Sequence, residues 1–177
     1  FTVGNIKRGK KKRTAAPPFI TSTLQQEAST KLGFGAKKTM QIAQKLYEGI
    51  DLGGRSEGLI TYMRSDSTRL PPVFLNDAFH YIETIYGKAY RGRARQQNDE
   101  NAQDAHEAIR MTNVMNTPES VKQYLTNDQY KLYHLIHCRT MASLMAAAKS
   151  DAVSVQIDSC GCQFTATGST LTFDGYL

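Results

Sequence analysis

The pattern of apolar and polar residues changes its period along the chain, and each period predicts a different kind of element. Near the C-terminus, Val153, Val155 and Ile157 alternate with polar residues, as in a half-buried strand. After a turn at 159–161, the segments CQFTATG and TLTFDGY read as two further strands. The first 20 residues also read as extended structure. The pattern therefore predicts strands at both ends of the chain.

The middle of the chain has the period of amphipathic helices. Ser22 with Gln25 resembles a capping box and predicts a helix from about Thr23. Thr126 with Gln129 makes a second box and predicts a long helix through 127–150. Between them, helices are predicted over 36–48, with Met40, Ala43 and Tyr47 on one face, from Pro71 and Pro72 to before Gly87, and from Thr117 and Pro118.

These elements predict a mainly α fold with flanking β structure. A helical domain over 23–150 would be inserted between strands at 1–22 and strands at 151–177 of a β-rich domain. The polar residues 90–103 lack periodicity and predict a mobile loop. Residues 102–112 predict a short helical or turn segment.

Charge adds a candidate partner to this picture. The 177 residues carry a formal net charge of +6, with basic runs at 7–13 and 90–95. Such a balance fits either a solvated basic surface or a polyanionic partner such as nucleic acid. The run KRGKKKR is expected in a solvated hairpin or loop. No apolar stretch approaches the roughly 20 residues of a membrane span, so no membrane partner is expected.

The stretch GLITYMRSDSTRL holds the candidate chemistry, because Tyr62 stands where apolar residues give way to polar ones. A tyrosine there is either a core residue with a solvated hydroxyl or a nucleophile. In an extended segment Tyr62 and Arg64 face the same side, where a guanidinium can bind two oxygens of the phosphate that the tyrosine attacks. A phosphotyrosine ester stores the energy of the broken bond, so resealing needs no ATP.

A second polar group lies in AHEAIR. If this segment is helical, His106 and Arg110 share a face, where both can contact phosphate. A histidine in this setting can equally satisfy a hydrogen bond in the core. His134 and His137 lack acidic or thiol companions at ligand spacing and are expected to be surface or packing residues.

The three cysteines do not match a zinc pattern. Cys160 and Cys162 lack the remaining ligands, so we expect them to hold no zinc. Scarce cysteine agrees with a reducing cytoplasm.

Three motifs in one order carry a family resemblance: PPFITSTLQQEASTKLGFGAKKTMQIAQKLYEG, then GLITYMRSDST, then AHEAIR. Together they resemble bacterial DNA topoisomerase I, a type IA DNA topoisomerase family, and FTATGSTLTFDGY is similar to strands of the family's gate domain. The resemblance implies that Tyr62 is the active-site tyrosine, that Arg64 holds the scissile phosphate and that His106 contacts DNA. It also implies a helical lid domain hinged on an arch-like gate.

The resemblance also implies how the whole enzyme works. Such enzymes cut one strand, hold its 5′ phosphate on tyrosine, pass the other strand and reseal, and so relax negatively supercoiled DNA. The expected partner is the single-stranded segment of that duplex, bound by a monomer in the cytoplasm at the nucleoid. The family binds Mg²⁺ through an acidic cluster, and no Asp-x-Asp-x-Glu pattern occurs here.

We therefore expect this chain to be an excised part of a larger enzyme, with no metal site of its own and inactive by itself. Two departures from the family pattern stand out: Ser65 replaces a frequent Thr, and Met111 replaces a frequent Pro after AHEAIR.

Two other function classes compete with this interpretation. One is a non-catalytic nucleic-acid-binding module that keeps the fold. The other is a strand transferase resembling the tyrosine recombinases, which needs several arginines and histidines around its tyrosine within one domain. The order of the three motifs argues against the second class.

Overall fold

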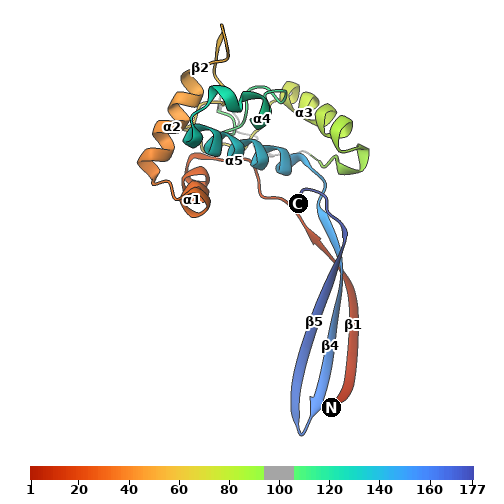
Figure 1. Ribbon diagram of the computed structural model, residues 1–177. Helices are drawn as coiled ribbons and strands as arrows, with labels where there is room; N and C mark the ends of the chain where they lie inside the picture. The colour runs from red at the N-terminus through yellow and green to blue at the C-terminus, as the bar shows by residue number, and fades with distance from the viewer. Residues whose placement is uncertain (94–105) are drawn as a thin grey trace.

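The computed structural model describes residues 1–93 and 106–177, which form a helical body and a long antiparallel sheet that extends away from it (Figure 1). The helices of these residues are α1 (Thr21–Leu32), α2 (Ala36–Glu48), α3 (Pro72–Ile85), η1 (Lys88–Tyr90), α4 (Pro118–Val121), η2 (Lys122–Tyr124) and α5 (Asn127–Leu144). The strands are β1 (Thr2–Arg13), β2 (Ile50–Asp51), β3 (Ser56–Glu57), β4 (Ala148–Ser159) and β5 (Cys162–Phe173). The chain is thus an α/β fold.

The long sheet joins the two ends of the chain. Its order is β1-β4-β5 and both pairings are antiparallel, so the N-terminal strand lies beside the first C-terminal one. Strands at both ends were predicted, and both are present. Two details differ. The basic run 7–13 belongs to β1 and pairs with β4 throughout, because the ladder satisfies its backbone groups. The two strands predicted after the turn are one continuous strand, β5.

No layer in the described chain covers either face of this sheet. Residues of β1 and almost all of β5 are exposed, while most of β4 is half-buried. The alternating burial predicted for 151–158 is therefore not seen. The central strand lies between two neighbouring strands, and most of its residues are half-buried at successive positions.

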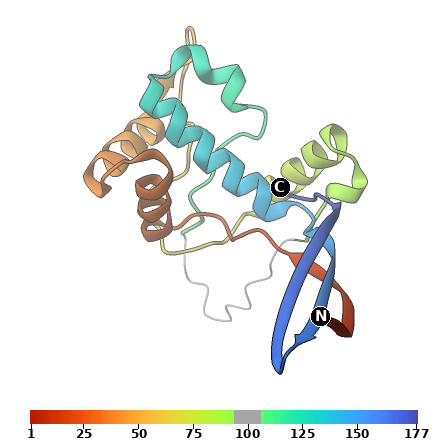
Figure 2. The ribbon, with the colours of Figure 1, turned by 60° about the horizontal axis from the view of Figure 1, so that its bottom comes forward.

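The helical body packs around α5, which crosses it with α1 and α2 on one side and α3 on the other (Figure 2). The capping box predicted for α5 is confirmed: the Gln129 N–H donates to the Thr126 hydroxyl, and the Thr126 N–H donates to the Gln129 side chain. The buried residues of α5 are Leu132, Tyr133, Leu135, Ile136, Thr140, Met141 and Leu144. This core fixes the surrounding helices.

The predicted end of α5 is wrong. The helix stops at Leu144 and not at residue 150. The carbonyl of Leu144 accepts a hydrogen bond from the Gly92 N–H at 2.9 Å, and the Ala146 N–H donates to the Tyr90 carbonyl at 2.7 Å. The chain leaves the helix because residues 90–92 offer these alternative partners.

Two other local predictions are corrected in the first two helices. α1 begins at Thr21, and the Thr23 hydroxyl accepts from the Ile20 N–H at 3.0 Å, so Ser22 and Gln25 do not form its capping box. In α2 the side chain of Tyr47 is 41% exposed, so Tyr47 does not lie on the buried face. That face consists of Thr39, Ile42, Ala43 and Leu46.

Candidate active site

The segment around Tyr62 is extended and alternates between the core and the surface. Its side chains from residue 61 to residue 66 are buried and exposed in strict turn. The buried ones are Thr61, Met63 and Ser65, and the exposed ones are Tyr62, Arg64 and Asp66. Tyr62 and Arg64 therefore both point away from the core, as the i and i+2 positions of an extended chain predict.

Thr61 anchors the beginning of this segment to residues 108–110. Its hydroxyl donates to the Ala108 carbonyl at 2.7 Å and accepts from the Arg110 N–H at 3.0 Å. Its own N–H donates to the Arg110 carbonyl at 2.9 Å. Because the side chain is 7% exposed, these bonds are shielded from water and hold the backbone beside Tyr62 in place.

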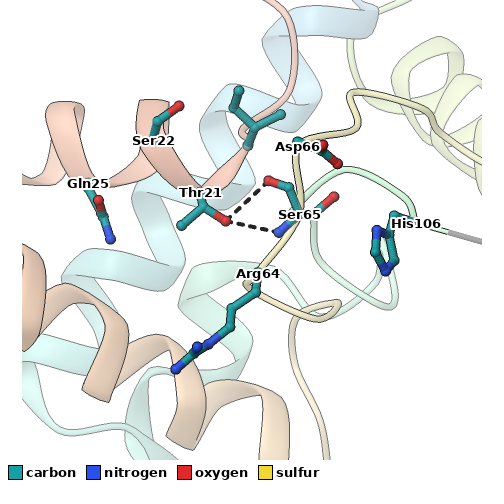
Figure 3. A pocket seen from close by; sticks show the side chains of 8 residues that line it. Thr21, Ser22, Gln25, Arg64, Ser65, Asp66 and His106 are labelled. Carbon is teal, nitrogen blue, oxygen red and sulfur yellow. Dashed lines mark hydrogen bonds between the residues drawn. The ribbon is translucent and has the colours of Figure 1, made fainter. Parts of the chain in front are cut away.

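Ser65 anchors the other end of the segment to the first residue of α1 (Figure 3). The Ser65 N–H donates to the Thr21 hydroxyl at 2.9 Å, and the Thr21 N–H donates to the Ser65 carbonyl at 2.9 Å. The Ser65 hydroxyl donates to the Glu107 carbonyl at 2.6 Å. Only a hydroxyl is needed for the bond to the Glu107 carbonyl, so the serine that replaces the family's frequent threonine keeps this contact.

The ring of Tyr62 rests edge-on against Tyr47 in the last turn of α2. The ring centroids are 5.3 Å apart and the planes meet at 64°, a favourable aromatic geometry. Gly58 lets the two segments approach, because a Cβ there would lie 2.5 Å from the Tyr47 carbonyl oxygen. Tyr62 is 45% exposed, and its hydroxyl has no hydrogen-bond partner within residues 1–93 and 106–177. The contact positions the ring and leaves the hydroxyl open to a substrate.

An open pocket of about 620 Å³ lies beside this segment (Figure 3). It is lined by Ile20, Thr21, Ser22, Gln25, Arg64, Ser65, Asp66 and His106. The structure thus brings Arg64 and His106, 42 positions apart in the chain, to one cavity. Tyr62 is not a lining residue and stands next to the pocket along the segment.

The start of α1 contributes a part of this pocket that sequence reasoning missed. Its first turn contains no acidic residue, and the N-terminal end of a helix attracts anions through its free N–H groups. Ser22 and Gln25, interpreted from sequence as a capping box, line the pocket instead. The sequence signal that could have predicted this part of the pocket was the presence of two polar residues, Ser22 and Gln25, at the start of a helix that they do not cap.

The AHEAIR segment is not helical, which corrects the prediction that His106 and Arg110 share a helix face. Described residues 106–111 form isolated antiparallel bridges, Phe19 with Ile109 and Ile60 with Met111. The segment is extended because its backbone pairs with two neighbouring chain segments. His106 lines the pocket, while Arg110 does not.

Arg110 has an internal role in place of the predicted phosphate contact. It is 8% exposed and its Nη2 lies 2.8 Å from the Glu107 carboxylate. Its Nη1 donates to the Met111 carbonyl at 2.8 Å, and the guanidinium stacks over the Phe74 ring at 4.1 Å. A guanidinium committed to these partners is not available to a ligand, so we do not keep Arg110 among the DNA contacts.

Met111 leaves the local backbone intact where the family often has proline. It is fully buried, and its bridge with Ile60 uses the N–H groups of Thr61 and Thr112. A residue without an N–H would make the same bridge, so this exchange does not change the turn.

The donor atoms around the pocket do not fit a Mg²⁺ site. Among the described residues that line it, Asp66 is the only carboxylate, and it stands two positions from Arg64. Across the residues that the structure describes, no group of three or more His, Cys, Asp or Glu side chains could hold a metal ion. No described helix is long and apolar enough to cross a bilayer.

Two comparisons with known proteins point to one family. A family model described as DNA topoisomerase matches residues 1–177. Among solved structures, full-length topoisomerase I from Thermotoga maritima is similar, with a TM-score of 0.88 and 42% sequence identity over 98% of this chain. The match covers 28% of that chain, so the present chain spans little more than a quarter of its length.

Proposed function

The chain belongs to the bacterial DNA topoisomerase family, and from this membership we propose that it carries the nucleophile of a type IA enzyme, Tyr62. The enzyme would relax negatively supercoiled DNA without ATP, by cutting one strand, passing the other and resealing. The observation that carries the proposal is the alternation over 61–66. It turns Tyr62 and Arg64 outward together, while the opposite side of the segment is held by buried hydrogen bonds.

The proposed step is an in-line attack on a phosphodiester. The Tyr62 oxygen loses its proton and forms a bond to phosphorus, while the bond to the 3′ oxygen of the neighbouring nucleotide breaks. That oxygen takes up a proton and leaves as a 3′ hydroxyl, and the 5′ phosphate stays on the tyrosine. The reverse reaction restores the strand with no external energy source, because the ester keeps the bond energy.

Arg64 and the pocket supply the electrostatic part of this proposal. Positive charge beside the phosphate stabilises the charge that develops on its oxygens in the transition state. The exposed Arg64 guanidinium and the start of α1 border the same cavity, so a phosphate placed there meets both a cation and free N–H groups. His106 lines the opposite part of the pocket in Figure 3 and is proposed to contact the DNA.

The fold supports a proposed division of labour. The helical body, predicted over 23–150 and running from the start of α1 to the end of α5, would act as a lid. The strands β1, β4 and β5 would belong to the gate that hinges it. Mg²⁺ would be held elsewhere in the full-length enzyme, which we propose to be a cytoplasmic, nucleoid-associated monomer. Bound there, it would supply charge stabilisation at the phosphate.

The first test replaces the attacking atom. In the full-length enzyme, Tyr62→Phe should abolish strand cleavage and relaxation while binding of single-stranded DNA persists, because only the hydroxyl is removed. The matched control is Tyr86→Phe, since Tyr86 is 50% exposed and lies at the end of α3. Relaxation that survives in Tyr62→Phe would favour the non-catalytic binding module.

The second test concerns Arg64. Arg64→Ala should slow cleavage about 10²–10³-fold, the scale expected when one preorganised donor is removed. Arg64→Lys should restore only part of the rate, because an ammonium cannot make the planar two-point contact. Arg55→Ala, an exposed arginine of the β2–β3 loop, is the control. Normal cleavage in Arg64→Ala would rule out the clamp.

The polarity of the covalent bond can be read with labelled oligonucleotides. With a label on the 3′ end of the substrate, cleavage by the full-length enzyme should leave the label attached to the protein. A label that travels with the protein only from the 5′ end would show the opposite polarity.

The chain alone should not cleave DNA, because its sequence lacks the family's acidic metal-binding pattern. Incubation with single-stranded DNA and Mg²⁺, followed by a denaturing gel, checks this. A covalent adduct on Tyr62 would contradict it.

A further inference from the structure

The tip of the β4–β5 hairpin carries two cysteines separated by one glycine. Ser159 and Cys162 are the last paired residues of the two strands, so Cys160 and Gly161 form a two-residue loop. Both loop residues have positive φ, 50° and 76°, as a type I′ turn requires. The thiols of Cys160 and Cys162 are free and exposed.

Ser159 is the neighbour of both cysteines, one in sequence and one across the ladder. The Ser159 hydroxyl lies 3.9 Å from the Cys160 sulfur and can donate to it. Ser159 also faces Cys162 directly across the ladder, and directly opposed side chains of an antiparallel pair lie on the same face. Ser159 therefore contacts the Cys160 sulfur and shares one face of the sheet with the Cys162 side chain.

Cys160 stands in a backbone conformation that favours other residues. Among the described non-glycine residues, it is the one with positive φ. Asparagine, aspartate or glycine usually occupies this turn position, because glycine has no Cβ and the short polar side chains of asparagine and aspartate hydrogen-bond the local backbone. The turn would be easier to form without this thiol.

We propose that Cys160 and Cys162 form a two-coordinate site for a soft, thiophilic cation, of which Cu(I) is the representative ion. Thiolates select soft ions, and two of them complete the coordination of Cu(I). Zinc needs four ligands, and the described residues offer no cluster of three or more. One Cu(I) ion displaces one proton from each thiol and forms two metal–sulfur bonds, with no change in oxidation state. The Ser159 hydroxyl would donate a hydrogen bond to the bound sulfur.

The site is independent of the proposed nucleophile. It lies at the end of the long sheet that points away from the helical body (Figure 1). Failure of one proposal therefore leaves the other untouched.

The competing thiol in the described chain is Cys138 on α5. Its sulfur lies 3.7 Å from the ring nitrogens of His134, which corrects the expectation that His134 has no thiol companion. This pair is therefore a second candidate for a soft ion. Partial desolvation by the surrounding protein also raises the pKa of the Cys138 thiol, which disfavours the thiolate. Cys138→Ser is thus the matched control for the hairpin thiols.

The test measures Cu(I) binding anaerobically by competition with a chromophoric Cu(I) chelator. The unchanged chain should take up Cu(I) in a one-to-one ratio, with an affinity that rises with pH because protons are released. Cys162→Ser should weaken binding by about 10²-fold or more, since the remaining thiol binds without its linked partner. Cys160→Asn should do the same while keeping the turn, because asparagine suits its conformation.

The outcomes are distinct. Cys138→Ser should bind like the unchanged chain, and excess Zn²⁺ should not displace the ion. One-to-one binding that survives in Cys160→Asn, or that disappears in Cys138→Ser, would overturn the proposal. Circular dichroism of each variant should match that of the unchanged chain, because the substituted thiols are exposed.

Discussion

The helical body and the long sheet are stabilised in different ways. In the body, side chains from α1, α2, α3 and α4 are removed from water around α5, and Leu132, Tyr133 and Ile136 are fully buried. In the sheet, Val3, Ile6 and Phe164 remain more than half exposed. The sheet has its backbone ladder but no packed layer, whereas the body has a core.

This difference explains where the candidate site lies. A catalytic group must be held within a fraction of an ångström, which requires supporting groups that are themselves packed. Tyr62 and Arg64 stand on a segment with its inward side chains in the core, and the sheet offers no such support. The two regions meet at Tyr90, which packs its ring on Phe173 and donates to the Asp174 carboxylate at 2.8 Å.

The largest expected contrast comes from truncating one apolar residue in each region. Ile136→Ala should lower the free energy of unfolding of the chain by about 2–5 kcal/mol, because it leaves a cavity in a closed core. Val155→Ala in the half-buried β4 should lower it by less than about 1 kcal/mol, because water can fill the space. Urea unfolding measures both. Equal decreases would show that the sheet has a core of its own.

The stability of the helical body should also depend on pH. Burial lowers the pKa of His137 to about 4, and its Nε2 has no hydrogen-bond partner in the described chain. The unfolded chain takes up this proton near the ordinary pKa of about 6.5, whereas the folded chain does so only near 4. Stability is therefore highest above pH 6.5 and falls as the pH drops toward 4, by about 3 kcal/mol in total.

The matched variants are His137→Gln and His134→Gln, the latter at an exposed position of α5. Unfolding free energies between pH 4 and 7 should lose much of this slope in His137→Gln and keep it in His134→Gln. The same slope in both variants would mean that His137 is not its source.

A smaller difference in unfolding free energy should distinguish the loss of a buried hydrogen bond at the site from the loss of an exposed one. Thr61→Val leaves the Ala108 carbonyl and the Arg110 N–H without their buried partner, so unfolding should become easier by about 1–2 kcal/mol. Thr112→Val removes an exposed bond to the Gly58 carbonyl and should cost less. In the full-length enzyme, only Thr61→Val should slow cleavage. A similar rate in both variants would mean that the anchor does not position Tyr62.

The smallest contrast concerns charge. The chain should bind single-stranded DNA weakly, with an affinity that falls steeply with salt, because of its net charge of +6. Replacing Lys10 and Lys12 of β1 by Gln should reduce the slope of log affinity against log salt by about 0.7 for each phosphate that the variant no longer neutralises. The matched pair in the body is Lys37 and Lys45, also changed to Gln. An affinity that is the same at low and physiological salt would exclude an electrostatic contact.

The sequence alone determined the features that depend on near neighbours. The start of α5 follows from Thr126 and Gln129, whose side chains and backbone groups satisfy each other three residues apart. The presence of strands at both ends follows from the local pattern, although the basic run 7–13 was expected in a loop and lies in β1. The outward pairing of Tyr62 with Arg64 follows from the two-residue period of extended backbone. These are local rules, so no distant contact was needed to apply them.

Only the tertiary structure decided the conformation of segments whose sequence has no clear helix or strand period, and which of their side chains reach the pocket. Residues 106–111 became extended because Phe19 and Ile60 offer their backbones as partners, and this pairing sends His106 to the pocket and Arg110 into the body. Ser22 and Gln25 reached the same pocket because Thr21 is bonded to Ser65. Each of these placements depends on residues that are far away in the chain, and a local pattern in the sequence carries no information about such contacts.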